Sequence, residues 1–229
     1  MQCLLPGMKQ LYLVANWKSN KTVDEAKNWI FQFKFRKTPD NLTIILCAPY
    51  TVLSLLKDEI EKAALPIFLG AQTISSFPNG AFTGEISAEM LKGLVEYVII
   101  GHSERRRYFH ETEEELQKKA QEAASRGLKI IYCVEGVNQR IPENAALVLY
   151  EPQTAIGSGK AEDPAISNQI CREISEKNHD IPVLYGGSVT EATLPGFLSQ
   201  PSISGVGVGK ASLDPEQFLR LVEAVSSYE

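Results

Sequence analysis

Eight short apolar runs, separated by stretches with room for helices, set the strongest limit on how this chain can fold. The runs are continuous rather than alternating, which is typical of strands buried on both faces. They cover residues 11–15, 43–47, 67–70, 97–100, 129–133, 147–150, 182–185 and 205–208. Strand–helix alternation predicts an α/β fold with a parallel sheet and right-handed crossovers. Eight units in one domain favour a closed (β/α)8 barrel over an open sheet.

Amphipathic helices are expected between these runs. Their pattern is clear at residues 23–36, 52–63, 113–125 and 164–177. Asp214-Pro215-Glu216 also has the signature of a helix start, with Asp as the cap and Pro in the first turn.

One connection is too short for a full crossover helix. Only thirteen residues separate Cys133 from Leu147, and Pro142 interrupts them. Proline disfavours a helix at the residue before it and removes one backbone donor. We therefore expect the helix between strands 5 and 6 to be shortened or missing. The outer face of these strands should then be covered by neighbouring helices or left partly exposed.

Composition agrees with a single globular domain over residues 1–229. The chain is 44% hydrophobic and 22% charged, so it can bury a core and has no signature of disorder. Its length suits one α/β barrel. Residues 1–7 are expected to form a loose extension before Met8. A net charge of -5 does not favour a nucleic-acid partner.

The cysteines indicate a reducing compartment. Cys3, Cys47, Cys133 and Cys171 are widely spaced and include no C-x-x-C pair. No apolar stretch approaches the roughly 20 residues of a membrane span, and the first residues do not resemble a signal peptide. We expect a cytoplasmic protein without a membrane partner.

Chemically useful residues gather where the predicted strands end, which is where (β/α)8 barrels carry their functional residues. They are Asn16 and Lys18 after the first run, His102, Ser103 and Glu104 after the fourth, Glu151 after the sixth, Ser188 after the seventh, and Gly209 and Lys210 at the eighth. Glu151 precedes a proline and a glycine-rich stretch, which indicates a base under a mobile cover. Loss of water beneath that cover would raise its pKa.

Several of these segments, in this order, resemble the triosephosphate isomerase family. They are Asn16-Trp17-Lys18, residues 80–85, residues 101–106, residues 151–160, Tyr185-Gly186-Gly187-Ser188 and residues 207–213. The resemblance covers nearly the whole chain. It implies a TIM barrel that interconverts dihydroxyacetone phosphate and D-glyceraldehyde 3-phosphate through an enediolate, in glycolysis and gluconeogenesis, without metal or cofactor.

The resemblance also implies roles for single residues. Glu151 would be the base and His102 the electrophile, kept neutral by the helix that follows it. Lys18 would be the cation of the site, Asn16 would orient Lys18 or bind the substrate oxygen, and Glu104 would pair with Lys18 or relay to the substrate.

The phosphate would be bound by backbone amides. The resemblance implies amides of Gly157 in a lid over residues 156–159, of Ser188, and of Gly209 and Lys210. Oriented amides suit an anion. Three departures from the family pattern are expected to affect the rate of catalysis. Lys210 replaces a glycine, and Gln153-Thr154 replaces Val-Trp. The segment after Cys133 also differs in sequence from the family pattern. A side chain at Lys210 is expected to resist the backbone angles that glycine allows.

The loop over residues 70–87 has the full family length. In the family it inserts into a second subunit, so the resemblance implies a homodimer through the loop around Thr83. Two other functions stay open at this point. One is a different phosphosugar isomerase or a lyase on a related barrel. The other is a barrel that has lost catalysis and serves as a binding or structural protein.

Overall fold

A computed structural model describes residues 9–33, 38–155 and 160–226. The strands are β1 (Leu11–Asn16), β2 (Leu42–Ala48), β3 (Ile67–Ala71), β4 (Tyr97–Ile100), β5 (Lys129–Val134), β6 (Ala145–Tyr150), β7 (Val183–Tyr185) and β8 (Gly205–Val208). The α-helices are α1 (Val23–Phe33), α2 (Tyr50–Lys62), α3 (Ala88–Leu91), α4 (Ser103–Phe109), α5 (Glu113–Ser125), α6 (Pro164–Lys177), α7 (Leu194–Leu198) and α8 (Pro215–Ser226), and a 3-10 helix, η1, spans Lys210–Ser212.

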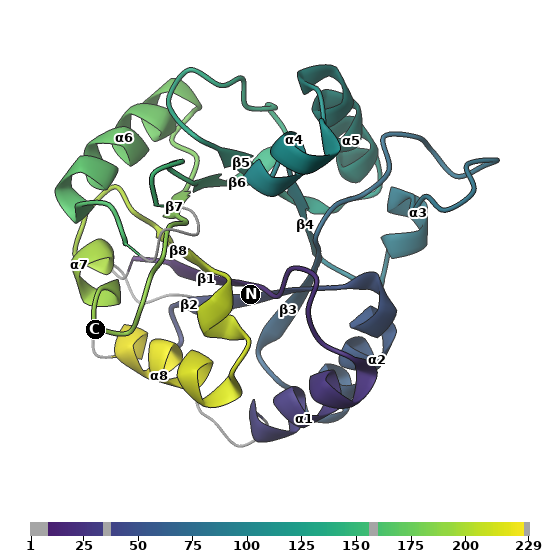
Figure 1. The fold of residues 1–229 in the computed structure, drawn as a ribbon, viewed down its shortest axis with the longest axis horizontal. Coiled ribbons are helices and arrows are strands. Elements are labelled where there is room, and N and C mark those ends of the chain that lie inside the picture. Colours follow the sequence, from purple (N-terminus) through teal and green to yellow (C-terminus); the bar gives the residue numbers. More distant parts are fainter. Residues whose placement is uncertain (1–8, 34–37, 156–159, 227–229) are drawn as a thin grey trace.

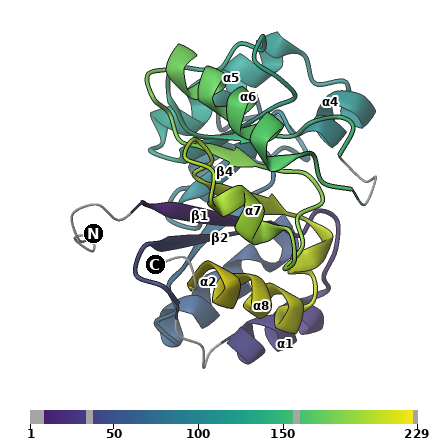
Figure 2. The same cartoon turned by 90° about the vertical axis from the view of Figure 1, so that its left-hand side faces the viewer.

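The eight strands pair in sequence order into a closed parallel barrel, which confirms the predicted fold class. Helices surround the strands as an outer ring (Figure 1), and the side view shows helices on opposite sides of the barrel (Figure 2). The predicted residues 1–7 extension lies outside the described part of the chain. None of the described helices has the length and apolar character to cross a membrane.

Alternate residues of most strands, β5 among them, fill two separate layers. Ile131 and Cys133 of β5 belong to the cluster inside the barrel, whereas Ile130, Tyr132 and Val134 belong to the larger cluster between strands and helices. All five are buried. This two-sided burial is why the strands read as continuous apolar runs.

The connection between β5 and β6 contains no helix, as the sequence predicts. Its residues 135–144 pass outside the barrel as turns and irregular chain, visible as a bare loop between α5 and α6 (Figure 1). Val137 and Ile141 of the connection pack against the outer cluster, and Asn144 Nδ2 donates to the carbonyl of Ala120 at 3.1 Å. The connection therefore covers part of the barrel itself, and the outward side chains of β5 are buried.

Closure of the barrel depends on a glycine at the start of β8. Gly205 pairs with Tyr12 of β1 and has a φ of +152°. A Cβ at this position would lie 2.0 Å from the Tyr12 carbonyl oxygen, a contact that no rotamer can relieve. Only glycine lets the two backbones approach this closely.

Gly205→Ala is expected to destabilise the protein because the added carbon would push β8 away from β1. We expect a loss of about 3 kcal/mol, or roughly 6–12 °C in the thermal midpoint for a chain of this length. Gly136→Ala is the matched control, since a Cβ there would meet nothing within 4 Å. Equal midpoints for both variants, measured by circular dichroism, would contradict this account of closure.

Candidate active site

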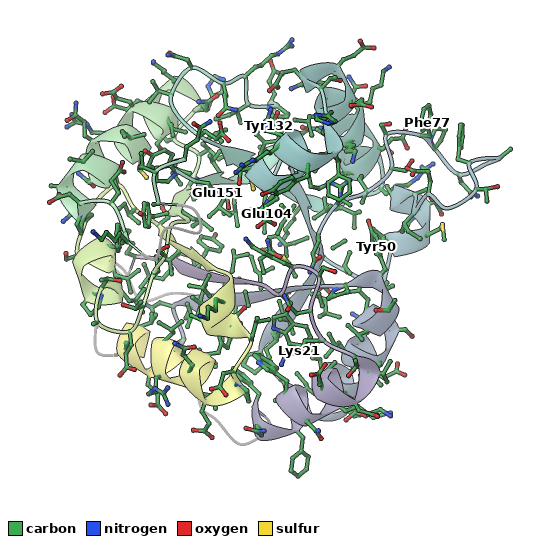
Figure 3. The ribbon with its side chains drawn as sticks, in the orientation of Figure 1. Lys21, Tyr50, Phe77, Glu104, Tyr132 and Glu151 are labelled. Atoms are coloured by element: carbon green, nitrogen blue, oxygen red, sulfur yellow. The ribbon has the colours of Figure 1, made fainter. Side chains whose placement is uncertain are left out.

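The carboxyl ends of the strands enclose a cavity of about 320 Å³. Most of the site residues predicted from the sequence line it: Asn16, Lys18, His102, Glu151, Ser188, Gly209 and Lys210. Glu104 contacts this group through Lys18 rather than lining the cavity. Gly157 and the rest of the predicted lid lie outside the described residues. Glu104 and Glu151 both lie inside the ring of helices (Figure 3).

Glu151 sits at the end of β6 with its side chain buried. Its amide donates to the Val134 carbonyl at 2.7 Å, which continues the β5–β6 ladder past the strand end. Oε1 lies 3.2 Å from Nε2 of His102, and Oε2 accepts a hydrogen bond from the Ser103 amide at 3.4 Å. Both oxygens thus have donors, so the carboxylate is held in one orientation.

His102 is the residue that caps α4. Its Nδ1 accepts a hydrogen bond from the Glu104 amide at 3.2 Å, so that nitrogen carries no proton. This contact leaves Nε2 of the ring directed at Glu151 as a hydrogen-bond donor. A helix N-terminus favours this arrangement because its exposed amides carry partial positive charge.

Burial and its neighbours act on the Glu151 carboxyl in opposite directions. Burial pushes the pKa of Glu151 upward, but His102, the Ser103 amide and Lys18 outweigh it, so the pKa lies below its ordinary value. The sequence-based expectation of a raised pKa concerned a carboxylate beneath a closed lid, and the lid residues 156–159 lie outside the described part of the chain. Among the described residues, the donors that face the carboxylate lower the pKa. Glu151 is thus ionised and able to accept a proton.

Lys18 is held in a strained backbone conformation. Its φ is +52°, in the left-handed region that non-glycine residues rarely adopt. Asn16 Oδ1 accepts from the Lys18 amide at 3.0 Å, and Gln72 Nε2 donates to the Lys18 carbonyl at 2.9 Å. The Lys18 ammonium then reaches Glu104 Oε1 at 2.5 Å. Strain of this kind persists only where the surroundings fix it, and here it aims the side chain into the site.

Gln72 is a site residue that the sequence analysis did not identify. It also donates to the Cys47 carbonyl at 3.1 Å, so it joins the loop after β1 to the end of β2 from the loop after β3. The signal was available, because Gln72 directly follows the last residue of β3. Gln72 was not considered for the site because the whole loop that contains it was assigned to dimerisation.

The end of β7 and the loop that follows it form hydrogen bonds to residues on both sides of the predicted lid. Ser188 Oγ donates to the Ala155 carbonyl at 2.8 Å, and Tyr185 OH accepts from the Glu162 amide at 2.8 Å. Gly187 has no room for a side chain, since a Cβ would lie 2.5 Å from the Tyr185 hydroxyl. Ala155 is thereby linked to the loop that lines the cavity, and Glu162 to the last residue of β7.

Two departures from the family pattern can be located. Lys210 is the first residue of η1, and its φ is not positive. The expectation that its side chain would resist the backbone is therefore wrong. Gln153 Nε2 donates to Glu135 Oε2 at 2.7 Å, which links the start of the predicted lid to the β5–β6 connection. Within the described ranges, no group of three or more metal-ligating side chains comes together.

Comparison with known proteins agrees with this geometry. The family model described as Triosephosphate isomerase matches residues 11–147 and 135–225, and the two matches overlap at the shortened β5–β6 connection.

Curated relatives named triosephosphate isomerase cover nearly the full chain. The relative from Mesomycoplasma hyopneumoniae (strain 7448) is 37% identical over 243 residues, covering 94% of this chain and 99% of its own. The one from Nostoc sp. (strain PCC 7120 / SAG 25.82 / UTEX 2576) is 35% identical over 240 residues, with the same coverage. The one from Chlamydia muridarum (strain MoPn / Nigg) is 37% identical over 257 residues, covering 97% and 94%.

The lowered pKa of Glu151 makes stability depend on pH in a defined direction. Because the folded pKa lies below the ordinary value of 4.5, the ionised carboxylate stabilises the fold at neutral pH. That contribution is lost as the pH falls through the folded pKa. The thermal midpoint of the wild type minus that of Glu151→Gln should therefore shrink between about pH 6 and about pH 3. Exposed Glu143→Gln is the control, and a difference that grows on acidification would refute the assignment.

Proposed function

The chain belongs to the triosephosphate isomerase family and interconverts dihydroxyacetone phosphate and D-glyceraldehyde 3-phosphate, and we propose that Glu151 is the base that moves the proton. The contact between Glu151 and His102 carries this assignment. It places an ionised carboxylate and a neutral N–H donor 3.2 Å apart inside one cavity. The enzyme is an isomerase of glycolysis and gluconeogenesis.

The two groups have complementary tasks in the reaction. Glu151 takes a proton from the carbon next to the carbonyl, and the Nε2–H of His102 donates a hydrogen bond to the oxygens on which charge develops. A neutral histidine held at a helix N-terminus is the known electrophile of this enzyme family. His102 and Glu151 lie within contact distance, so both can reach one substrate bound in the cavity.

Lys18 supplies positive charge for the enediolate and the phosphate. Glu104 neutralises that charge before substrate binds, and Asn16 holds the Lys18 backbone in place. For the phosphate we propose the amides of Ser188, Gly209 and Lys210, which line the same cavity next to β7 and β8. This is the usual phosphate position of such barrels. The proposed contribution of Gly157 and the lid falls outside the described residues.

Glu151→Gln tests the base. The amide cannot accept a proton at neutral pH, so kcat should fall by about 10²–10⁴ with a smaller change in KM. A coupled assay with each triose phosphate measures it, and exposed Glu143→Gln should retain wild-type activity. Full turnover in a purified, folded Glu151→Gln enzyme would remove Glu151 from the mechanism. Absence of turnover in the wild type would instead favour another phosphosugar enzyme or a non-catalytic barrel.

We also propose that the protein is a homodimer through the loop around Thr83. The loop between β3 and α3 projects beyond the ring of helices (Figure 1), and Phe77 points outward from it (Figure 3). Phe77 and Phe82 stack at 4.4 Å between ring centroids, yet they remain 46% and 38% exposed. Met90 on α3 is 55% exposed as well. Exposed aromatic and methionine side chains on a protruding loop are typical of an interface.

Phe82→Asp tests the dimer, because a charge would replace an apolar contact at the interface. Sedimentation at micromolar concentration should give twice 25.3 kDa for the wild type and 25.3 kDa for the variant, with reduced activity. Ile166→Asp is the control, since Ile166 is equally apolar and 55% exposed but lies on α6. A fully active wild-type monomer would overturn the proposal.

A cytoplasmic location is proposed on the state of the thiols. Cys47, Cys133 and Cys171 are free and buried. Burial raises the pKa of all three, to about 12 for Cys171, so they stay protonated and inert. Reduced structural thiols suit a reducing compartment.

A further inference from the structure

Lys210 is the second lysine, after Lys18, among the residues that line the active-site cavity. It lies next to Gly209 in the loop after β8, and both residues line the cavity together with Lys18 and Ser188. A Cβ on Gly209 would lie 3.3 Å from Cε of Lys18, so the Lys18 stem passes directly beside this loop. Lys18 and Lys210 therefore belong to two loops that lie side by side at the same cavity.

Among the described residues, the charged groups of the site other than Lys210 have partners. The Lys18 ammonium contacts Glu104 at 2.5 Å, and the Glu151 carboxylate is held by His102 and the Ser103 amide. Lys210 is exposed, and across residues 9–33, 38–155 and 160–226 its side chain has no acidic partner within ion-pair distance. Its flexible four-carbon stem lets the ammonium turn toward an anion in the cavity.

We propose that the Lys210 side chain is a specificity-determining cation that binds the phosphate of the substrate, in addition to the backbone amides of the loop. This inference rests on the proposed phosphate site. A phosphate dianion that enters the cavity would then meet the Lys210 ammonium, which has no acidic partner among the described residues. The Lys18 ammonium, in contrast, is already paired with Glu104. Because Lys210 is exposed, its effect is screened by salt and falls as ionic strength rises.

Inorganic phosphate is the probe, because its binding can be measured by calorimetry without turnover. Lys210→Gln should weaken phosphate binding roughly three- to tenfold at an ionic strength of about 0.02 M, and the difference should shrink toward about 0.2 M. Lys210→Arg keeps the charge on a similar backbone and should restore most of the affinity. Lys27→Gln is the control, since Lys27 is exposed on α1 and does not line the cavity.

The outcomes separate the inference from the function on which it rests. Equal phosphate affinity in the wild type and Lys210→Gln at both ionic strengths would overturn it, as would equal weakening in Lys210→Gln and Lys210→Arg, which would indicate a backbone effect. Phosphate binding that depends on the Lys210 charge, in a protein that does not turn over triose phosphates, would support the inference and refute the function. In the active enzyme, KM should rise in Lys210→Gln by a factor similar to the loss of phosphate affinity.

Discussion

Pairing of β8 with β1 closes the sheet, and the site depends on that closure. The first and last strands meet where Gly205 lies against the backbone of Tyr12. Once they meet, the carboxyl ends of all eight strands surround one opening. Lys18 from the start of the chain and Gly209 from its end become neighbours only through this contact.

Inside the barrel, one large side chain occupies the space that two glycines leave open, and this arrangement shapes the cavity. Leu149 of β6 points into the barrel, and the missing side chains of Gly186 and Gly207 make room for it. A Cβ at Gly207 would lie 2.7 Å from the leucine. The strand ends beside Leu149 therefore consist of bare backbone. The two glycines line the cavity beside Ser188 and Gly209, whose amides are proposed to bind the phosphate.

Much of this architecture is predictable from the sequence, because strands buried on both faces appear in it as continuous apolar runs. The strand ends then identify Glu151, His102 and Lys18. Length and Pro142 were sufficient to predict the missing helix. Three features were not predictable; the first two depend on contacts between segments distant in the sequence, and the third on a local turn. The pKa of Glu151 reflects donors from α4, the strained Lys18 is fixed by Gln72, and the backbone at Lys210 takes ordinary angles inside a 3-10 turn.

The short β5–β6 connection has a consequence for the order in which the barrel assembles. Parallel strands can pair only after the chain between them has closed into a loop, and the entropy lost in closure grows with loop length. Residues 135–144 form a much shorter loop than residues 151–182, which join β6 to β7. The difference favours closure of the shorter loop by about 1 kcal/mol. The missing helix thus makes β5 and β6 a local pair in a fold that otherwise depends on long-range contacts, and it gives the folding chain a natural place to start.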